Sequence, residues 1–238
     1  MRELSASATA KEMNIFDRAF SLCVSPPNAL QHSHAGPVDV QILRTVNGRE
    51  CQFFIPKKHR SDTPSPLMVM FHGAKGEACE WIELLRHIAE SANILLLAPS
   101  SSGMTWDLMP AGKSQDVQLL EYLLNEVFDG YSIDASHVAV GGFSDGASYA
   151  LAIGLTNPEI FTHIIALSPG SLTVPLRQSG AKVFIAHGTR DEVLPVSASR
   201  QIHSRLVSAG YAVDYTEFDS GHRVPLAIAH SAVELFLQ

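Results

Sequence analysis

Residues 138–155 read VAVGGFSDGASYALAIGL. A Val-rich run leads into GFSDG at 142–146, and a run that is small and apolar on all sides follows, up to the Asn157-Pro158 pair. This pattern predicts a buried strand that turns sharply into a buried helix. Glycines flank such a turn because a Cβ there would collide with the neighbouring strand or helix. The turn would hold Ser144 in a strained conformation at a helix N-terminus, which makes it a candidate nucleophile. The alternative role for Ser144 is an ordinary helix N-cap.

Short apolar runs alternate with segments of helical period around this motif. The predicted strands cover residues 67–71, 94–98, 138–140, 164–167, 183–186 and 211–218. Ahead of them, Asn47-Gly48 between 38–46 and 49–55 predicts an antiparallel hairpin. Apolar stripes predict helices over 78–92, 117–127, 198–209 and 226–236, with Gly130 and Gly210 just past the ends of two of them. The order of elements predicts an α/β fold with a mostly parallel central sheet, an N-terminal antiparallel hairpin and helices on both faces.

Composition excludes several classes of protein. A length of 238 residues fits a single domain with a sizeable core, and we place that domain at 37–238 after an N-terminal arm at 1–36. The net charge of −7, with no cluster of Lys and Arg, argues against a nucleic-acid partner. Three cysteines without CxxC spacing argue against a disulfide scaffold or a cysteine zinc site. No apolar run approaches the ~20 residues of a membrane span, and residues 1–16 lack a signal core, so we expect a cytoplasmic protein.

A serine nucleophile needs a base, and position must choose it among eleven histidines. Only His72, His187 and His222 directly follow predicted strands, where sites form in open α/β sheets. We favour His222, because it lies in a flexible turn between the last strand and the last helix. His187 remains an alternative base, although packing at the strand end is the more ordinary role for it.

An orienting acid must follow another strand. Asp191 lies in the loop after the predicted strand 183–186 and has the reach to accept a hydrogen bond from an imidazole. Glu192 is its immediate competitor, and Asp219 is less favoured because it lies too near His222 in the chain. The ordinary fate of such loop carboxylates is a solvated surface charge.

The loop after the strand 67–71 can supply an oxyanion hole. It begins His72-Gly73-Ala74, and a turn there can direct the backbone N–H of Ala74 into the site beside the N–H of Asp145. A plain strand–helix turn without a catalytic role is the alternative.

With these elements in the order Ser, Asp, His, the sequence resembles the α/β-hydrolase superfamily, and within it the phospholipase/carboxylesterase-type serine esterases. The resemblance runs from about residue 37 to the end of the chain. It implies hydrolysis of ester or thioester bonds without metal or cofactor, with Ser144 as nucleophile, His222 as base, Asp191 as orienting acid, and the N–H groups of Ala74 and Asp145 as oxyanion donors.

Two features go beyond that motif set. Many relatives carry Gln after the serine, where this chain has Asp145; we expect a carboxylate there to disfavour anionic acyl groups. The loop 99–115 is expected to cover the site, with Trp106, Leu108 and Met109 as candidate walls of an acyl pocket or, equally, as ordinary packing residues.

The sequence therefore predicts a serine carboxylesterase that forms an acyl-enzyme on a small-molecule ester or thioester. The rival functions are a lactonase or peptidase on the same scaffold, or a catalytically silent ligand-binding protein, because a fold does not guarantee an activity.

Overall fold

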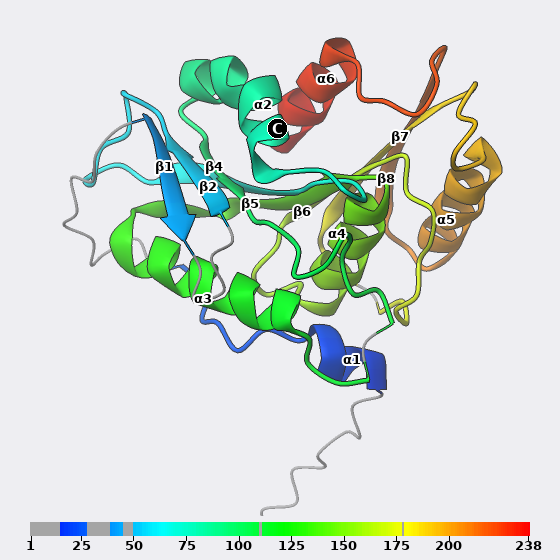
Figure 1. Cartoon of the computed structure of the whole chain (residues 1–238), viewed down its shortest axis with the longest axis horizontal. Helices are drawn as coiled ribbons and strands as arrows, with labels where there is room; N and C mark the ends of the chain where they lie inside the picture. Colours follow the sequence, from blue (N-terminus) through cyan, green and yellow to red (C-terminus); the bar gives the residue numbers. More distant parts are fainter. Residues whose placement is uncertain (1–14, 28–38, 45–49, 110, 178) are drawn as a thin grey trace, which may run out of the picture.

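A computed structural model describes residues 15–27, 39–44, 50–109, 111–177 and 179–238. Within this part of the chain, eight strands form one sheet in the order β1-β2-β4-β3-β5-β6-β7-β8 (Figure 1). The strands are β1 (Asp39–Arg44), β2 (Glu50–Ile55), β3 (Ser65–Phe71), β4 (Leu95–Ala98), β5 (Ile133–Phe143), β6 (His163–Leu167), β7 (Lys182–Gly188) and β8 (Ala212–Phe218). From β4 to β8 all neighbouring strands run parallel, so their carboxyl ends meet along one edge of the sheet.

The predicted N-terminal hairpin is present. β1 pairs antiparallel with β2 from Asp39 opposite Ile55 to Arg44 opposite Glu50, and β2 continues antiparallel onto β4. The Asn47-Gly48 turn itself lies outside the described residues. The hairpin forms one edge of the sheet, and β8 forms the other.

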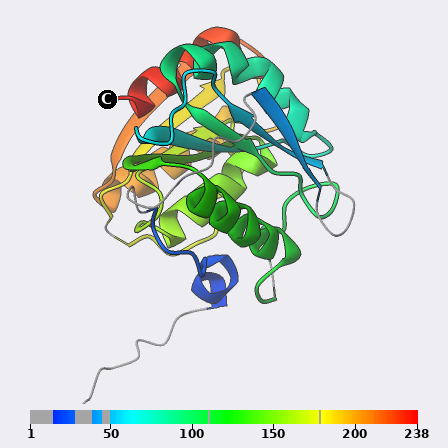
Figure 2. The same ribbon diagram turned by 90° about the vertical axis from the view of Figure 1, so that its left-hand side faces the viewer.

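Helices cover both faces of the sheet, as Figures 1 and 2 show. Their bounds are α1 (Ile15–Phe20), α2 (Ala78–Ala92), α3 (Gln115–Gly130), α4 (Asp145–Thr156), α5 (Val196–Ser208) and α6 (Leu226–Phe236). Apolar residues of α2 and α6 form the core of one face, and those of α3, α4 and α5 form the core of the other. Most residues of the predicted stripes lie on these faces, but Leu226, the first residue of the stripe predicted for 226–236, is 54% exposed.

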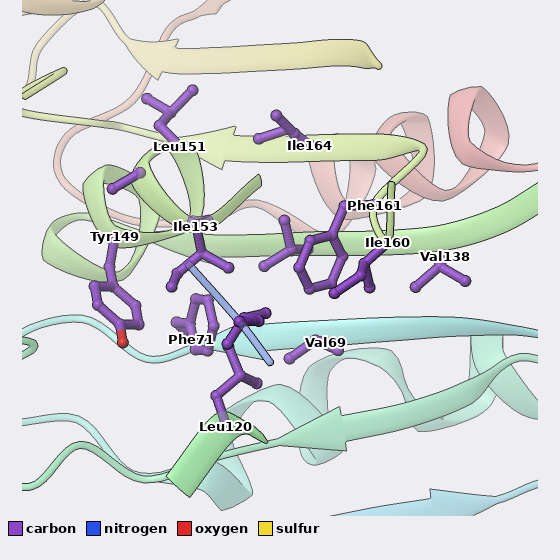
Figure 3. Packing of buried hydrophobic residues seen from close by; sticks show 14 of the residues in the cluster. Val69, Phe71, Leu120, Val138, Tyr149, Leu151, Ile153, Ile160, Phe161 and Ile164 are labelled. Carbon is purple, nitrogen blue, oxygen red and sulfur yellow. The ribbon is translucent and has the colours of Figure 1, made fainter. Parts of the chain in front are cut away.

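Helix α4 packs at the centre of the larger core. All its residues from Gly146 to Leu155 are buried, as expected for a helix without a polar face. The Tyr149 ring packs edge-to-face on Phe71 of β3 at 4.9 Å between centroids (Figure 3). This burial holds the turn at the start of α4 rigidly against the sheet.

Two features differ from the sequence prediction. The described part of the predicted arm packs on the domain, because α1 contacts α4 and the side chains of Ala19, Phe20, Leu22 and Val24 are buried. Helix α3 includes Gly130 and is capped by Tyr131 in an extended conformation, so Gly130 does not serve as a left-handed residue past the helix end. Gly210 does take a positive φ, of 87°, directly after α5.

Candidate active site

Ser144 lies at the turn between β5 and α4 with φ of 57° and ψ of −121°, a conformation that is strained for a residue with a Cβ. The backbone N–H of Ser144 donates to the carbonyl of Leu167 at 2.9 Å, which ties the turn to β6. A Cβ on Gly142 would lie 2.5 Å from the Gly146 carbonyl, and one on Gly146 would lie 2.3 Å from the Phe71 carbonyl. Both glycines are therefore required by close backbone packing around Ser144.

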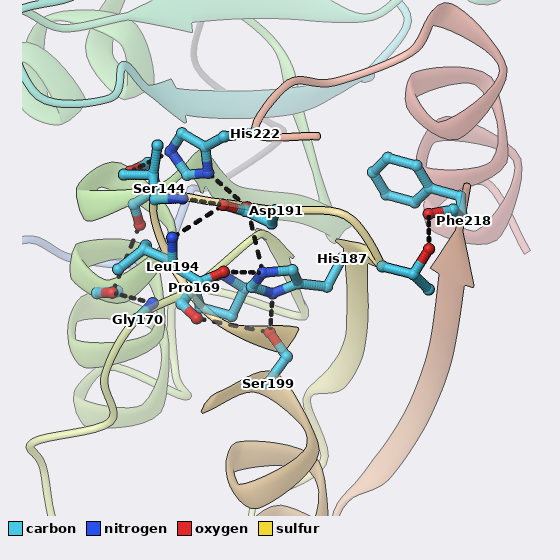
Figure 4. A network of polar contacts seen from close by, with 12 residues as sticks. Ser144, Pro169, Gly170, His187, Asp191, Leu194, Ser199, Phe218 and His222 are labelled. Carbon is cyan, nitrogen blue, oxygen red and sulfur yellow. Dashed lines mark hydrogen bonds and ion pairs between the residues drawn. The ribbon is translucent and has the colours of Figure 1, made fainter. Parts of the chain in front are cut away.

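Two further loops bring a histidine and a carboxylate to this turn. The Nε2 atom of His222 lies 2.9 Å from the Ser144 Oγ, and its Nδ1 atom lies 2.6 Å from Oδ2 of Asp191. His222 follows β8, and Asp191 follows β7, so each reaches the site from the carboxyl end of a parallel strand. Figure 4 shows the three side chains in a row. A neutral His222 with its proton on Nδ1 can accept the Ser144 proton on Nε2.

Close backbone contact joins these two loops. The N–H of Thr189 donates to the Phe218 carbonyl at 2.8 Å, and that of Arg190 donates to the Ser220 carbonyl at 2.9 Å. A Cβ on Gly188 would lie 2.5 Å from the Ser220 oxygen, so the approach depends on glycine at that position. The distance between Asp191 and His222 is thus set by main-chain packing.

The Asp191 side chain is fully buried, yet its pKa lies below the ordinary value. Burial alone would raise this pKa, but hydrogen bonds from His222 and from the N–H groups of Leu194 and Val193 stabilise the anion more strongly. Neither competitor has this environment: Glu192 is exposed, and Asp219 is largely exposed and pairs with Arg190 at 2.7 Å. Asp191 is therefore an anion at neutral pH and can stabilise a cationic His222.

Two backbone donors flank the serine. The loop after β3 lies directly against it, because a Cβ on Gly73 would be 3.5 Å from the Ser144 Cβ. Among the described residues, neither the N–H of Ala74 nor that of Asp145 donates a hydrogen bond within the protein. These two groups are available to an oxygen that develops negative charge.

The loop 99–109 braces this donor loop. The carbonyl of Met104 accepts from the N–H of Lys75 at 2.6 Å, and the N–H of Ser101 donates to Nε2 of His72 at 3.0 Å. The hydroxyl of Thr105 donates to Oδ2 of Asp145 at 2.8 Å. Nothing in the sequence pairs Thr105 with Asp145 across 40 positions, and sequence reasoning missed this contact.

The three predicted pocket walls lie in different surroundings. Trp106 is only 3% exposed: its ring stacks on Tyr149 at 5.0 Å, and its indole N–H donates to the His72 carbonyl at 2.8 Å. Leu108 is half-buried against the same core, and Met109 is 71% exposed. The contacts of Trp106 support a structural role inside the core instead of a wall against substrate, because both its ring and its N–H are satisfied there.

Comparison with known proteins assigns the chain to a family. The sequence profile described as Phospholipase/Carboxylesterase matches residues 110–234, a little over half of the chain. This chain belongs to the phospholipase/carboxylesterase family. The matched region contains the Ser144 turn and the loops of Asp191 and His222.

Curated relatives match in part. Acyl-protein thioesterase 1 of Eremothecium gossypii is 31% identical over 103 residues, which cover 41% of this chain and 43% of that protein. Acyl-protein thioesterase 1 of Mycosarcoma maydis is 40% identical over 76 residues, 28% of this chain and 30% of that protein. Feruloyl esterase B of Thermothelomyces thermophilus is 27% identical over 124 residues, 48% of this chain and 43% of that protein. The chain thus matches less than half the length of each of these relatives.

Solved structures extend the likeness over most of the chain. The acetyl xylan esterase from Aspergillus awamori aligns with a TM-score of 0.67 and 16% identity over 83% of this chain and 98% of that chain. A phospholipase/carboxylesterase from Dyadobacter fermentans aligns with a TM-score of 0.61 and 19% identity over 89% and 100%. At these identities the likeness shows the fold, which is that of the α/β-hydrolases.

Within the described residues, no helix is both long and apolar enough to cross a membrane.

Proposed function

We propose that the protein is a serine hydrolase that cleaves carboxylic esters or thioesters of small molecules through an acyl-enzyme. The observation that carries this proposal is the row of contacts from Ser144 Oγ to His222 Nε2 at 2.9 Å and from His222 Nδ1 to Asp191 Oδ2 at 2.6 Å. Two backbone donors beside the serine and membership of an esterase family support it. The names of the curated relatives favour a thioester or an ester of an aromatic acid as the bond to test first.

The reaction would proceed in two halves. Ser144 Oγ attacks the substrate carbonyl carbon while His222 Nε2 takes the hydroxyl proton, and the carbonyl oxygen becomes an oxyanion held by the N–H groups of Ala74 and Asp145. The bond from carbon to the leaving oxygen or sulfur then breaks, and His222 returns the proton to the leaving group. A water molecule, deprotonated by His222, attacks the acyl-enzyme, releases the acid and restores the Ser144 hydroxyl.

The carboxylate of Asp145 has no part in this mechanism, but it should restrict which acyl groups the site accepts. It is half-buried next to the nucleophile and is held by the Thr105 hydroxyl. A negative charge so near the reacting carbonyl would repel an anionic acyl group. We therefore expect neutral acyl groups to be preferred over half-esters of dicarboxylic acids.

The direct test is turnover of p-nitrophenyl esters from acetyl to octanoyl, together with an acyl thioester and a feruloyl ester, by the wild type and by Ser144→Ala. Ser144→Ala should lose labelling by a fluorophosphonate and lose turnover by a factor of about 10⁶. Ser231→Ala is a matched control, because that residue is exposed and its hydroxyl donates to the carbonyl of Ala227 in its own helix α6. Labelling that survives in Ser144→Ala would overturn the choice of nucleophile, and a wild type that is neither labelled nor active would favour a silent ligand-binding protein.

A further inference from the structure

A second histidine contacts the carboxylate of Asp191. His187 lies near the end of β7 and is completely buried. Its Nε2 atom is 3.2 Å from Oδ2 of Asp191, the same oxygen that lies 2.6 Å from Nδ1 of His222. Figure 4 shows the two imidazole rings facing one carboxylate from different sides. The proposed mechanism uses only one of these histidines.

The partners of His187 determine where its proton lies. Nε2 is 2.9 Å from the carbonyl oxygen of Leu194, which can only accept a hydrogen bond, so Nε2 carries a hydrogen. Nδ1 lies 2.5 Å from the hydroxyl of Ser199, which is also fully buried. The Ser199 hydroxyl is much nearer to Nδ1, at 2.5 Å, than to the Pro169 carbonyl, at 3.5 Å. A neutral His187 therefore accepts from Ser199 on Nδ1 and donates from Nε2 to the Leu194 carbonyl, with the same nitrogen 3.2 Å from Oδ2 of Asp191. Both nitrogens are satisfied without any charge.

His187 completes the set of donors around the Asp191 carboxylate. Oδ1 accepts from the N–H groups of Val193 at 2.9 Å and Leu194 at 2.8 Å. Oδ2 accepts from His222 at 2.6 Å and lies 3.2 Å from Nε2 of His187. Without His187, His222 would be the only polar side chain among the described residues to contact Oδ2, and its charge changes during the reaction. The carboxylate could then turn about its Cβ–Cγ bond and carry the His222 ring away from Ser144.

We infer that His187 is a positioning residue for the proposed reaction: its Nε2–H fixes Oδ2 of Asp191 so that the His222 ring keeps its line to Ser144. This inference rests on the proposed function. Its ordinary competitor is a core histidine that only fills space at the end of β7. The two roles differ in one respect, because positioning depends on an N–H at the place of Nε2, whereas packing depends on the volume of the ring.

A pair of amide variants separates these roles. In His187→Asn the amide lies near the place of Nδ1, so it can keep the contact with Ser199 but is too short to reach Asp191. In His187→Gln the amide extends to the place of Nε2 and can keep an N–H beside Oδ2. Both variants remove the ring and put an amide in the same cavity, so both should fold. Because asparagine is smaller than glutamine, a packing role predicts a larger loss of stability in His187→Asn but no change in the kcat of the folded enzyme, whereas positioning predicts a loss of kcat.

The measurements are kcat, KM and the rate of fluorophosphonate labelling, on protein whose folded fraction is determined by circular dichroism. His187→Asn should lower kcat and the labelling rate by about 10- to 100-fold with KM changed less than about twofold, since small misplacements of a reacting group cost that much. His187→Gln should recover most of this loss. The matched control is His163→Leu, which removes another buried histidine at the opposite end of the sheet and should lower stability without changing kcat.

The outcomes distinguish this inference from the proposed function. An active wild type with a His187→Asn variant at wild-type kcat, or with a His187→Gln variant as impaired as His187→Asn, would overturn the positioning role alone. A wild type that shows neither turnover nor labelling would overturn the proposed function and the inference together.

Discussion

At the scale of single residues, the difference between neighbouring carboxylates decides the chemistry. Asp191 and Glu192 are adjacent in the chain, but the first side chain is fully buried among N–H donors and the second is exposed. A buried carboxylate that accepts several hydrogen bonds keeps its charge and its direction, whereas an exposed one is free to rotate in water. Residue type alone therefore cannot identify the orienting acid.

The first prediction compares these two acids. Asp191→Asn should lower kcat by about 10⁴-fold, because an amide at this place favours the wrong tautomer of His222. Glu192→Gln should leave kcat within about twofold. Steady-state turnover of the best p-nitrophenyl ester measures both variants. A collapse of turnover in Glu192→Gln with an active Asp191→Asn would show that the orienting acid is wrongly assigned.

At the scale of elements, the loop between β4 and α3 acts as a brace for the loop between β3 and α2. Asp116, in the first turn of α3, is buried and accepts hydrogen bonds from the N–H groups of Ser102 and Asp107, which closes the bracing loop on itself. Trp106 then joins that closed loop to the His72 carbonyl. The free N–H of Ala74 is held in place by a neighbouring element, in addition to its own short loop.

The second prediction removes one bond of this brace. Trp106→Phe keeps an aromatic ring against Tyr149 but leaves the His72 carbonyl without its indole donor, which should cost about 1–3 kcal/mol of stability. We expect kcat to fall by up to about tenfold, less than the ~10²- to 10³-fold loss on removing an oxyanion donor itself. Urea unfolding and steady-state kinetics measure the two effects.

Trp81→Phe is the control for this change. Trp81 is equally buried but lies on α2, in the core of the opposite face. Trp81→Phe should lower the free energy of unfolding and leave kcat unchanged. Equal losses of kcat in both variants would argue against a specific brace at Trp106.

At the scale of the whole molecule, the segment 15–27 ties the start of the described chain to the end of α4. Asn157 is completely buried, and its side-chain oxygen accepts from the N–H of Leu22 at 2.8 Å while its amide donates to the carbonyls of Phe20 at 2.9 Å and Ile153 at 2.7 Å. One side chain thus joins backbone groups of the segment 15–27 to the end of α4. The segment is a structural part of the domain.

The third prediction follows from these contacts. Asn157→Ala leaves buried backbone groups of Phe20 and Leu22 unpaired and should cost about 2–4 kcal/mol of unfolding free energy. Asn125→Ala, on the exposed side of α3, should cost far less. Chemical denaturation of both variants measures the difference. A stability of Asn157→Ala within error of the wild type would mean that the segment does not depend on this side chain.

The fourth prediction concerns acid stability. His163 is buried at the start of β6, and burial, with smaller effects of Lys182 and His137, lowers its pKa to about 4. In the unfolded chain its pKa is about 6.5. Between these values the unfolded state binds a proton that the folded state does not, so stability rises with pH. This contribution is complete above pH ~6.5 and is lost as the pH falls towards 4, at a cost of about 3 kcal/mol.

Unfolding free energies of the wild type and His163→Leu between pH 7 and pH 4 measure this effect. Over that range, the unfolding free energy of the variant should fall by about 3 kcal/mol less than that of the wild type. His230→Leu, at an exposed position of α6, should decline in parallel with the wild type. Parallel curves for His163→Leu and the wild type would show that folding does not lower the pKa of His163.

Local patterns were sufficient for much of this architecture. The hairpin, the order of strands and helices, the strained turn at Ser144 and the need for its two flanking glycines all follow from periodicity and sterics within a few residues. The loop positions of Asp191 and His222 follow from the same strand pattern, because carboxyl ends of parallel strands share one edge. The short helix α1 had no signal of comparable strength, since it is six residues long and its stability comes from contact with α4.

Only the tertiary structure decided which residues that are far apart in the chain contact each other. Nothing local indicates that the Trp106 indole meets the His72 carbonyl, that Thr105 holds Asp145, or that His187 shares a carboxylate oxygen with His222. The physical reason is that hydrogen bonding and burial depend on which groups close packing brings within 3 Å, and sequence periodicity encodes the face of an element but not its partner. The sequence by itself therefore determined which residues stand at the rim of the sheet, and folding decided how each of them is held.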